Sequence, residues 1–181
     1  MIFDNYPWTN FHELNLDWLI RKMMQISEAV GLTRSLYQAH GVADHVTALP
    51  AGVITQIPLT SNGAVVVGNA FAISNDGGIT VKETGTYKIT ASAYLHAFKD
   101  STSIGVYIYT GDNFNTASEL TSARIHQNND TVGFYGAFSV APKLVKLNAG
   151  QSAYLQARVN GADSEAFDDA VSTYLMIERV D

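Results

Sequence analysis

The stretch Tyr87-Lys88-Ile89-Thr90-Ala91-Ser92-Ala93-Tyr94-Leu95-His96-Ala97 decides the fold class, because its side chains alternate regularly along the chain. The odd positions are apolar and the even positions are mostly polar, so the pattern repeats every two residues. Such alternation is typical of a strand with one face on a core and the other face turned outward. We therefore predict an antiparallel β protein in which the odd positions of this stretch are buried.

The same two-residue period recurs from residue 53 to the C-terminus, in short segments separated by turn sequences. Many short strands with no helical segments between them are typical of a β-sandwich or a jelly roll. The expected turns are Asn62-Gly63, Asn75-Asp76-Gly77-Gly78, Thr110-Gly111-Asp112, Asn128-Asn129-Asp130, Asn148-Ala149-Gly150 and Asn160-Gly161. The expected strands are residues 53–59, 64–74, 79–81, 85–98, 103–110, 119–127, 131–140, 152–160 and 172–180.

A helical period precedes the strands and predicts a helix over residues 16–41, ended by Gly41. Its apolar positions recur at alternating steps of three and four, which defines a heptad seam. Such a stripe needs identical helices beside it or a groove in a partner. About three heptads is short for an independent coiled coil, because isolated helices of about 12–15 residues are marginal. The seam residues are Leu16, Leu19, Met23, Ile26, Val30 and Tyr37.

Large aromatic side chains gather before and at the start of this helix, around Pro7. One interpretation is that they pack back on the helix start. We favour a docking peptide in residues 1–15, because a thin helix offers little surface to cover so many rings, and exposed aromatic clusters mark contact sites. The candidate docking residues are Tyr6, Pro7, Trp8, Phe11, Leu14 and Trp18.

A resemblance supports the docking interpretation. An N-terminal signature of structural proteins in small tailed phages of Gram-positive hosts is similar to the run Asn5-Tyr6-Pro7-Trp8-Thr9-Asn10-Phe11-His12-Glu13-Leu14-Asn15-Leu16-Asp17-Trp18-Leu19-Ile20. The resemblance implies attachment of this segment to a virion, as on fibre or appendage proteins. It does not say whether the portal, collar, tail or capsid protein is the partner.

Several tyrosines lie on the strand faces opposite the expected core positions, among them Tyr94, Tyr135, Tyr154 and Tyr174. Scattered exposed aromatics are ordinary on a protein surface. Tyrosines on several neighbouring strands favour a protein interface instead, where this residue type is enriched. We therefore expect these four residues to contact another chain.

Three segments resemble the superfamily of tumour necrosis factor (TNF) and complement globular heads. These are Gly85-Thr86-Tyr87-Lys88-Ile89, the run from Val145 to Ala157, and Ser172-Thr173-Tyr174-Leu175-Met176-Ile177. The resemblance covers most of residues 45–181 and implies a ten-stranded jelly roll that trimerises through aromatic residues near a three-fold axis. Those residues would match Tyr135 and Tyr174, with Tyr154 as a further candidate. The superfamily's Gly-Asp pair is Gly150-Gln151 here.

Composition excludes several classes of function. The 181 residues carry a net charge of −6 without a basic run, so nucleic acid and anionic membranes are poor partners. The chain has no cysteine, which excludes disulfides and thiolate metal sites. We expect no signal peptide and no membrane insertion, because no stretch approaches the roughly 20 apolar residues of a membrane span.

The sequence offers no positioned catalytic base, nucleophile or phosphate loop, so we expect neither an enzyme nor a cofactor. The five histidines lack the spacing of metal ligands. Acidic residues gather in one loop, at Asp163, Glu165, Asp168 and Asp169. A solvated acidic loop is the favoured interpretation, and a calcium site is the alternative.

These observations combine into one prediction. The chain is expected to hold a docking peptide (1–15), a helix in a short trimeric coiled coil (16–41), a linker (42–52) and a jelly-roll head (53–181). Such a homotrimer would be a virion fibre or appendage of a tailed phage, made in the host cytoplasm, with a host-surface glycan as a candidate partner. The alternatives are a decoration or cementing protein without a receptor and, less favoured, a carbohydrate-active appendage enzyme.

Overall fold

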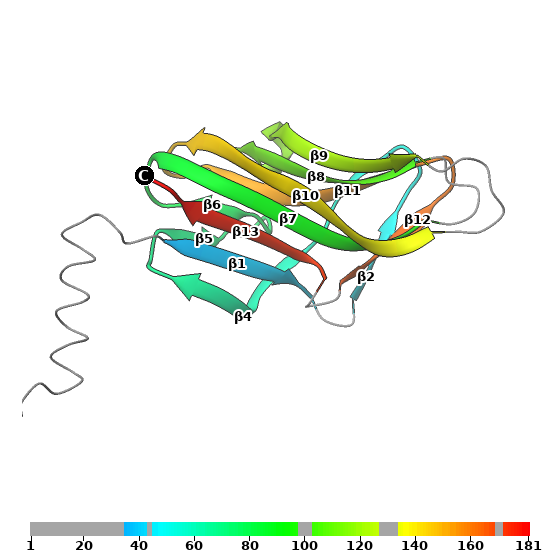
Figure 1. The fold of residues 1–181 in the computed structure, drawn as a ribbon, viewed down its shortest axis with the longest axis horizontal. Helices are drawn as coiled ribbons and strands as arrows, with labels where there is room; N and C mark the ends of the chain where they lie inside the picture. Colours follow the sequence, from blue (N-terminus) through cyan, green and yellow to red (C-terminus); the bar gives the residue numbers. More distant parts are fainter. Residues whose placement is uncertain (1–34, 43–44, 98–102, 127–133, 169–171) are drawn as a thin grey trace, which may run out of the picture. The chain divides into compact units, whose positions relative to one another are not determined.

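The computed structural model describes residues 35–42, 45–97, 103–126, 134–168 and 172–181. These residues form two facing sheets, one of which is built around the long strand β7 (Gly85–Ala97) (Figure 1). The alternation predicted for β7 is confirmed, because the side chains at its odd positions from Tyr87 to Leu95 are all fully buried. The domain is therefore mainly β and antiparallel, as the sequence predicts.

The first sheet, here called sheet I, has seven strands. One edge of β7 pairs along its length with β10, and the other edge pairs first with β13 and then with β12. β1 lies between β13 and β4, and β2 pairs with β12. The strands other than β7 are β1 (Leu36–Gly41), β2 (His45–Leu49), β4 (Leu59–Val67), β10 (Phe134–Leu147), β12 (Ser164–Asp168) and β13 (Tyr174–Arg179).

The second sheet, sheet II, has six strands in the order β5-β6-β11-β8-β9, with β3 also paired to β11. Its strands are β3 (Ile54–Gln56), β5 (Phe71–Ile73), β6 (Ile79–Val81), β8 (Ser103–Gly111), β9 (Ser118–His126) and β11 (Ser152–Asn160), and the short 3₁₀ helix η2 (Phe114–Thr116) connects β8 to β9. The described residues thus form more strands than the ten that the resemblance implied. The difference comes partly from β3, β5 and β6, which are only three residues long.

Apolar side chains from both sheets meet in one core. Ile89 and Ile177 from sheet I and Ile108 and Leu155 from sheet II are fully buried there. Each such side chain contributes about 1.5–3 kcal/mol relative to an exposed position. The core therefore fixes which face of each sheet points inward, and so which face is left for partners.

The expected helix does not extend to Gly41, because residues 36–41 form β1. Tyr37 is therefore not a seam residue: it is 6% exposed and packs edge-on against Phe71, with 6.4 Å between the ring centroids. The physical reason is that Tyr37, Ala39 and Gly41 also follow a period of two, and all three are buried in β1. Over six residues that period competes with the helical one.

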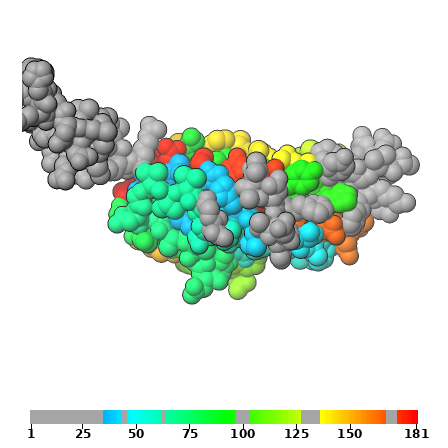
Figure 2. Space-filling model, turned by 90° about the horizontal axis from the view of Figure 1, so that it is seen from below, coloured from blue at the N-terminus to red at the C-terminus, as the bar shows by residue number. Residues whose placement is uncertain are grey.

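The expected linker of residues 42–52 was also wrong, because its centre forms β2, whose Leu49 is fully buried. The Asn62-Gly63 pair does not make a turn between strands, because both residues lie within β4. There the register against β1 shifts between Gln38, opposite Val65, and His40, opposite Thr60, so extra residues of β4 form a bulge. Seen from below, β4 and β1 form a continuous part of the surface (Figure 2).

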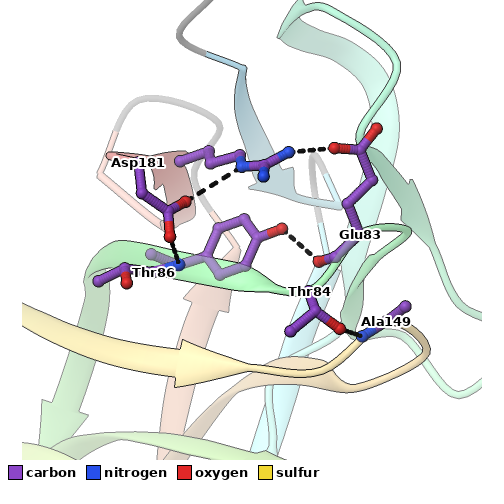
Figure 3. A network of polar contacts seen from close by, with 7 residues as sticks. Glu83, Thr84, Thr86, Ala149 and Asp181 are labelled. Atoms are coloured by element: carbon purple, nitrogen blue, oxygen red, sulfur yellow. Dashed lines mark hydrogen bonds and ion pairs between the residues drawn. The ribbon is translucent and has the colours of Figure 1, made fainter. Parts of the chain in front are cut away.

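Polar contacts join the end of β13 to two turns (Figure 3). Arg179 pairs with Glu83 and donates through Nε to Asp181, 3.2 Å away. Tyr87 donates its hydroxyl to the Glu83 carbonyl over 2.6 Å, and the Asp181 carboxylate accepts from the Thr86 amide over 2.8 Å. This network ties the C-terminus to the start of β7.

Candidate interaction surface

The outer face of sheet I, which points away from sheet II, is assembled by strand register. His40, Tyr174, Ser92 and Ser139 lie opposite one another in a row across β1, β13, β7 and β10. Ser139 donates to Ser92 over 3.2 Å. Because the two serines are small, the half-buried ring of Tyr174 is flanked by short side chains on the side of β7 and β10.

A parallel row adds apolar surface. Val65, Gln38, Met176 and Thr90 lie opposite one another across β4, β1, β13 and β7. Val65 is 50% exposed and Val67, two positions further along β4, is 52% exposed. Valines side by side on the same face of an outer strand form an apolar surface that water contacts.

The opposite end of this face carries another aromatic residue. Tyr94 on β7 lies opposite Ala137 on β10, and Val46 on β2 is 46% exposed. Lys88 forms an ion pair with Glu178 at 3.6 Å near one end of β7, and His96 Nδ1 lies 3.9 Å from a Glu165 carboxylate oxygen at the other end. An apolar and aromatic centre with charged groups at its border is the usual anatomy of a protein interface.

Two of the four tyrosines expected at an interface therefore share this face, Tyr94 and Tyr174. Tyr135 has its backbone in β10 opposite His96, and its side chain lies outside what the structure describes. Tyr154 lies in sheet II and is fully buried within its own chain. We therefore remove Tyr154 from the expected interface.

Tyr154 instead holds two turns together. Its hydroxyl donates to the Asp76 carboxylate over 2.7 Å, and its ring packs edge-on against Phe114 at 5.9 Å. Asp76 also accepts from the Ser74 hydroxyl and from the Phe114 amide. Burial would raise the pKa of Asp76, but these hydrogen bonds outweigh it and lower that pKa below its usual value. Burial and the bond to Asp76 raise the pKa of Tyr154 to about 12.

The acidic loop does not gather into a metal site in the part of the chain that is described. Asp163 accepts from the Ala51 amide over 2.8 Å, whereas Glu165 faces His96. Within the described ranges no group of three or more histidine, aspartate or glutamate side chains could hold a metal ion. Asp169 lies outside these ranges, and nothing is described of the side chain of Asp168.

The docking residues and the seam residues before Tyr37 also lie outside the described residues. Their roles stay predictions. Among the residues that the structure does describe, no helix is long and apolar enough to cross a membrane.

Sequence reasoning missed the valines of β4. Val65, Val66 and Val67 were expected in a strand, but three successive apolar residues do not tell which of them is exposed. All three are about half exposed, because β4 lies at the border of the described sheet. The unbroken apolar run was the available signal of an exposed apolar border, since ordinary border strands carry charges or proline.

Comparison with known proteins identifies the architecture. The chain matches no family model and no curated protein. It is similar to the crystal structure of murine APRIL at pH 5.0, with a TM-score of 0.60, 14% identity, and coverage of 81% of this chain and 99% of that one. It is also similar to the structure of Eiger TNF from S. frugiperda, with a TM-score of 0.60, 11% identity, and coverage of 82% and 94%.

The domain is a TNF-like jelly roll. The jelly-roll architecture implied by the sequence resemblance is thereby confirmed for this part of the chain, whereas the implied number of ten strands is not. At such low identity the likeness concerns the fold alone. The TNF-like domain has its two outer faces built very differently, and the functional argument rests on that difference.

Proposed function

We propose that this chain is a structural protein of a tailed-phage virion, a fibre or appendage head that forms a homotrimer. The observation that carries the proposal is the outer face of sheet I. This face keeps apolar surface although the chain already has a closed core, and the residues that provide it are Tyr94, Tyr174, Met176, Val65 and Val67. Burying such surface against identical chains stabilises an assembly at about 25 cal/mol per Å².

A trimer is favoured over other assemblies by two independent features. The TNF-like fold, through the resemblance described above, implies assembly around a three-fold axis. The predicted heptad seam of residues 16–30 would pair with identical helices, one of the two partners open to it, and is too short to hold them alone. A head that associates through sheet I would supply the missing stability.

Attachment to the virion is assigned to the docking peptide. Its aromatic residues have the composition of binding hot spots, and its sequence resembles the phage attachment signature. The partner would be a portal, collar, tail or capsid protein. The proposed role is non-enzymatic and needs no cofactor, and its localisation is the virion.

Sedimentation equilibrium of the whole chain tests the assembly. We expect a trimer at micromolar concentration and a shift toward monomer in Tyr174→Ala, because truncating an interface anchor costs about 2 kcal/mol or more at each contact. Tyr109→Ala is the matched control, since Tyr109 is half-buried on the outer face of sheet II. A wild-type monomer, or equal dissociation in both variants, would overturn the assembly through sheet I.

A complementation experiment tests the virion role. A phage that lacks the gene is supplied with the chain deleted for residues 1–14, and purified particles are probed for the head. We expect a folded trimer that no longer joins particles. Normal incorporation would mean that the head makes the contact, and absence of the wild-type chain from particles would refute the virion role.

A further inference from the structure

The outer face of sheet II carries two arginines that strand register places on one line. Arg158 on β11 lies opposite Gly105 on β8, and Gly105 lies opposite Arg124 on β9. Paired residues of antiparallel strands point to the same side, and alternate strands are about 10 Å apart. Two long cationic side chains therefore rise from the same face, one strand apart on either side of a glycine.

Gly105 shapes the space between them. A Cβ atom at this position would lie 2.9 Å from Arg124 Cγ and 2.8 Å from the Ala123 carbonyl oxygen. Without that atom, the Arg124 guanidinium lies over the Tyr107 ring, 4.7 Å from its centroid. A cation stacked on an aromatic face is held in place while its outer N–H groups stay available.

Arg158 has no neutralising partner among the residues that the structure describes. Its side chain is partly buried, and its buried Nε has no hydrogen-bond partner among the described residues. Among the described residues its guanidinium makes no hydrogen bond or ion pair. A partly buried guanidinium without an acceptor costs free energy, because the lost hydration is not replaced. Such a group is expected where a ligand supplies the missing acceptor.

Tyr109 lies on the same face as the two arginines, two residues beyond Tyr107 along β8. Burial raises the pKa of Tyr109 and Glu119 raises it further, whereas Arg124 and Arg158 both lower it. Both guanidinium groups therefore contribute positive potential on this face of sheet II. Glu119 contacts Arg124 at 3.4 Å and is the acidic group that competes there for an incoming anion.

We infer that Arg158 and Arg124 form a binding site for the anionic group, phosphate or carboxylate, of a charged glycan. Guanidinium groups bind such anions through paired N–H donors, which gives direction as well as charge. Gln56 and Ser122 lie on the same face and are partly exposed, so they suit a hydroxylated chain, whereas Gln156 in the same row is buried. In naming a glycan the inference rests on the proposed virion role together with the host-surface glycan that the sequence analysis gave as a candidate partner, but the site lies within one chain and requires no assembly.

The net charge of the protein sharpens this assignment. At −6, the chain as a whole repels polyanions, so binding of one would depend on a local group rather than on general attraction.

The experiment is calorimetric titration of the full chain with three polymers at fixed low salt: a polyol phosphate, a polyuronate and neutral dextran. The two anionic polymers distinguish phosphate from carboxylate, and dextran reports binding by hydroxyl groups alone.

Variants then locate the site. We expect Arg158→Gln and Arg124→Gln each to weaken binding at least tenfold, and Arg158→Lys to weaken it less, because it keeps the charge without the planar fork. Lys143→Gln on β10 is the charge-matched control and should change affinity less than twofold. Glu119→Gln removes the competing carboxylate and should strengthen binding, a gain that a purely structural role does not produce.

Binding of neither anionic polymer by the wild-type chain would overturn the inference. Equal losses in Lys143→Gln and Arg158→Gln would overturn it as well, since they would show general electrostatics. If Arg158→Gln does not fold, Arg124→Gln and Arg158→Lys decide the matter. Sedimentation of the same variants should show wild-type assembly, so failure of this site and failure of the sheet I interface remain distinguishable.

Discussion

Replacing Tyr154 by phenylalanine tests whether this residue holds turns together or faces another chain. The substitution keeps the buried ring and removes only the hydroxyl that donates 2.7 Å to Asp76. A hydrogen bond to a charged group contributes about 1.5–3 kcal/mol. Asp76 is exposed and keeps its bonds from Ser74 and Phe114, so solvent screening reduces the expected loss to about 1 kcal/mol.

Thermal unfolding measures this loss. For a domain of this size, about 1 kcal/mol corresponds to a fall of roughly 2–4 °C in Tm. The matched control is Tyr109→Phe, on the neighbouring strand opposite Tyr154, where a change within about 0.5 kcal/mol is expected. Assembly should be unchanged in both variants, because the Tyr154 side chain is fully buried within its own chain.

The pH dependence of the loss identifies the partner. The pKa of Asp76 is lowered in the folded chain, so its stabilising effect is present above the unfolded value of 3.8 and disappears as pH falls through the folded value. The raised pKa of Tyr154, about 12 against 10.0, contributes stability that is present below pH 10 and is lost as pH rises through 12. The deficit of Tyr154→Phe should thus be largest between about pH 5 and 9 and shrink on both sides. A loss that does not shrink at any pH below 3.8 at which the fold persists, or one matched by Tyr109→Phe, would refute the assignment of this hydroxyl to Asp76.

Two smaller changes check the turns. Gly150→Ala should destabilise the folded domain by about 1–2 kcal/mol in chemical denaturation, because the φ of +92° at this position is unfavourable for alanine. Steric contact is not the cause, since no atom lies within 4 Å of the added Cβ. An unchanged denaturation midpoint would contradict the turn geometry. Arg179→Gln should raise the pKa of the Asp181 side chain part of the way toward its usual value in an NMR titration. The rise is only partial because the hydrogen bond from the Thr86 amide is the largest cause of the lowered pKa, and Arg179 is the second. An unchanged pKa would exclude the pairing of Arg179 with Asp181 in Figure 3.

The fold class could be predicted from the sequence because alternation is a local property. The buried odd positions of β7 follow from neighbouring residues alone. The strand conformation of Tyr37 could not be predicted in this way, because it depends on pairing with residues far away in the sequence. Tyr37 on β1 lies opposite Ile177 on β13. Over six residues, the helical and extended periods fit the same apolar positions, and only that distant pairing decides between them.

The candidate sites show the same limit. Alternation placed Tyr154 correctly on the side opposite Ala153 and Leu155, but it could not show that Phe114 and the turn at Asp76 cover that side. The pair of Arg158 and Arg124 was missed for a related reason. The two residues lie on strands that do not pair with each other, and they come into line only through Gly105 on the strand between them.

The two proposals assign different roles to the two outer faces: assembly to sheet I and anion binding to sheet II. Assembly through sheet I would bury Tyr94 and Tyr174 and leave sheet II, on the other side of the core, directed to solvent on every copy. A trimer would then present three Arg158 sites at fixed separations. A repeating anionic polymer can occupy several sites at once, so its avidity exceeds the affinity of one site without any new contact.

The affinity of each chain for a monomeric anion should therefore be the same in the trimer and in a dissociated Tyr174→Ala variant, whereas the affinity for a long polymer should fall with dissociation. Equal polymer affinity in both forms would show that the sites act singly.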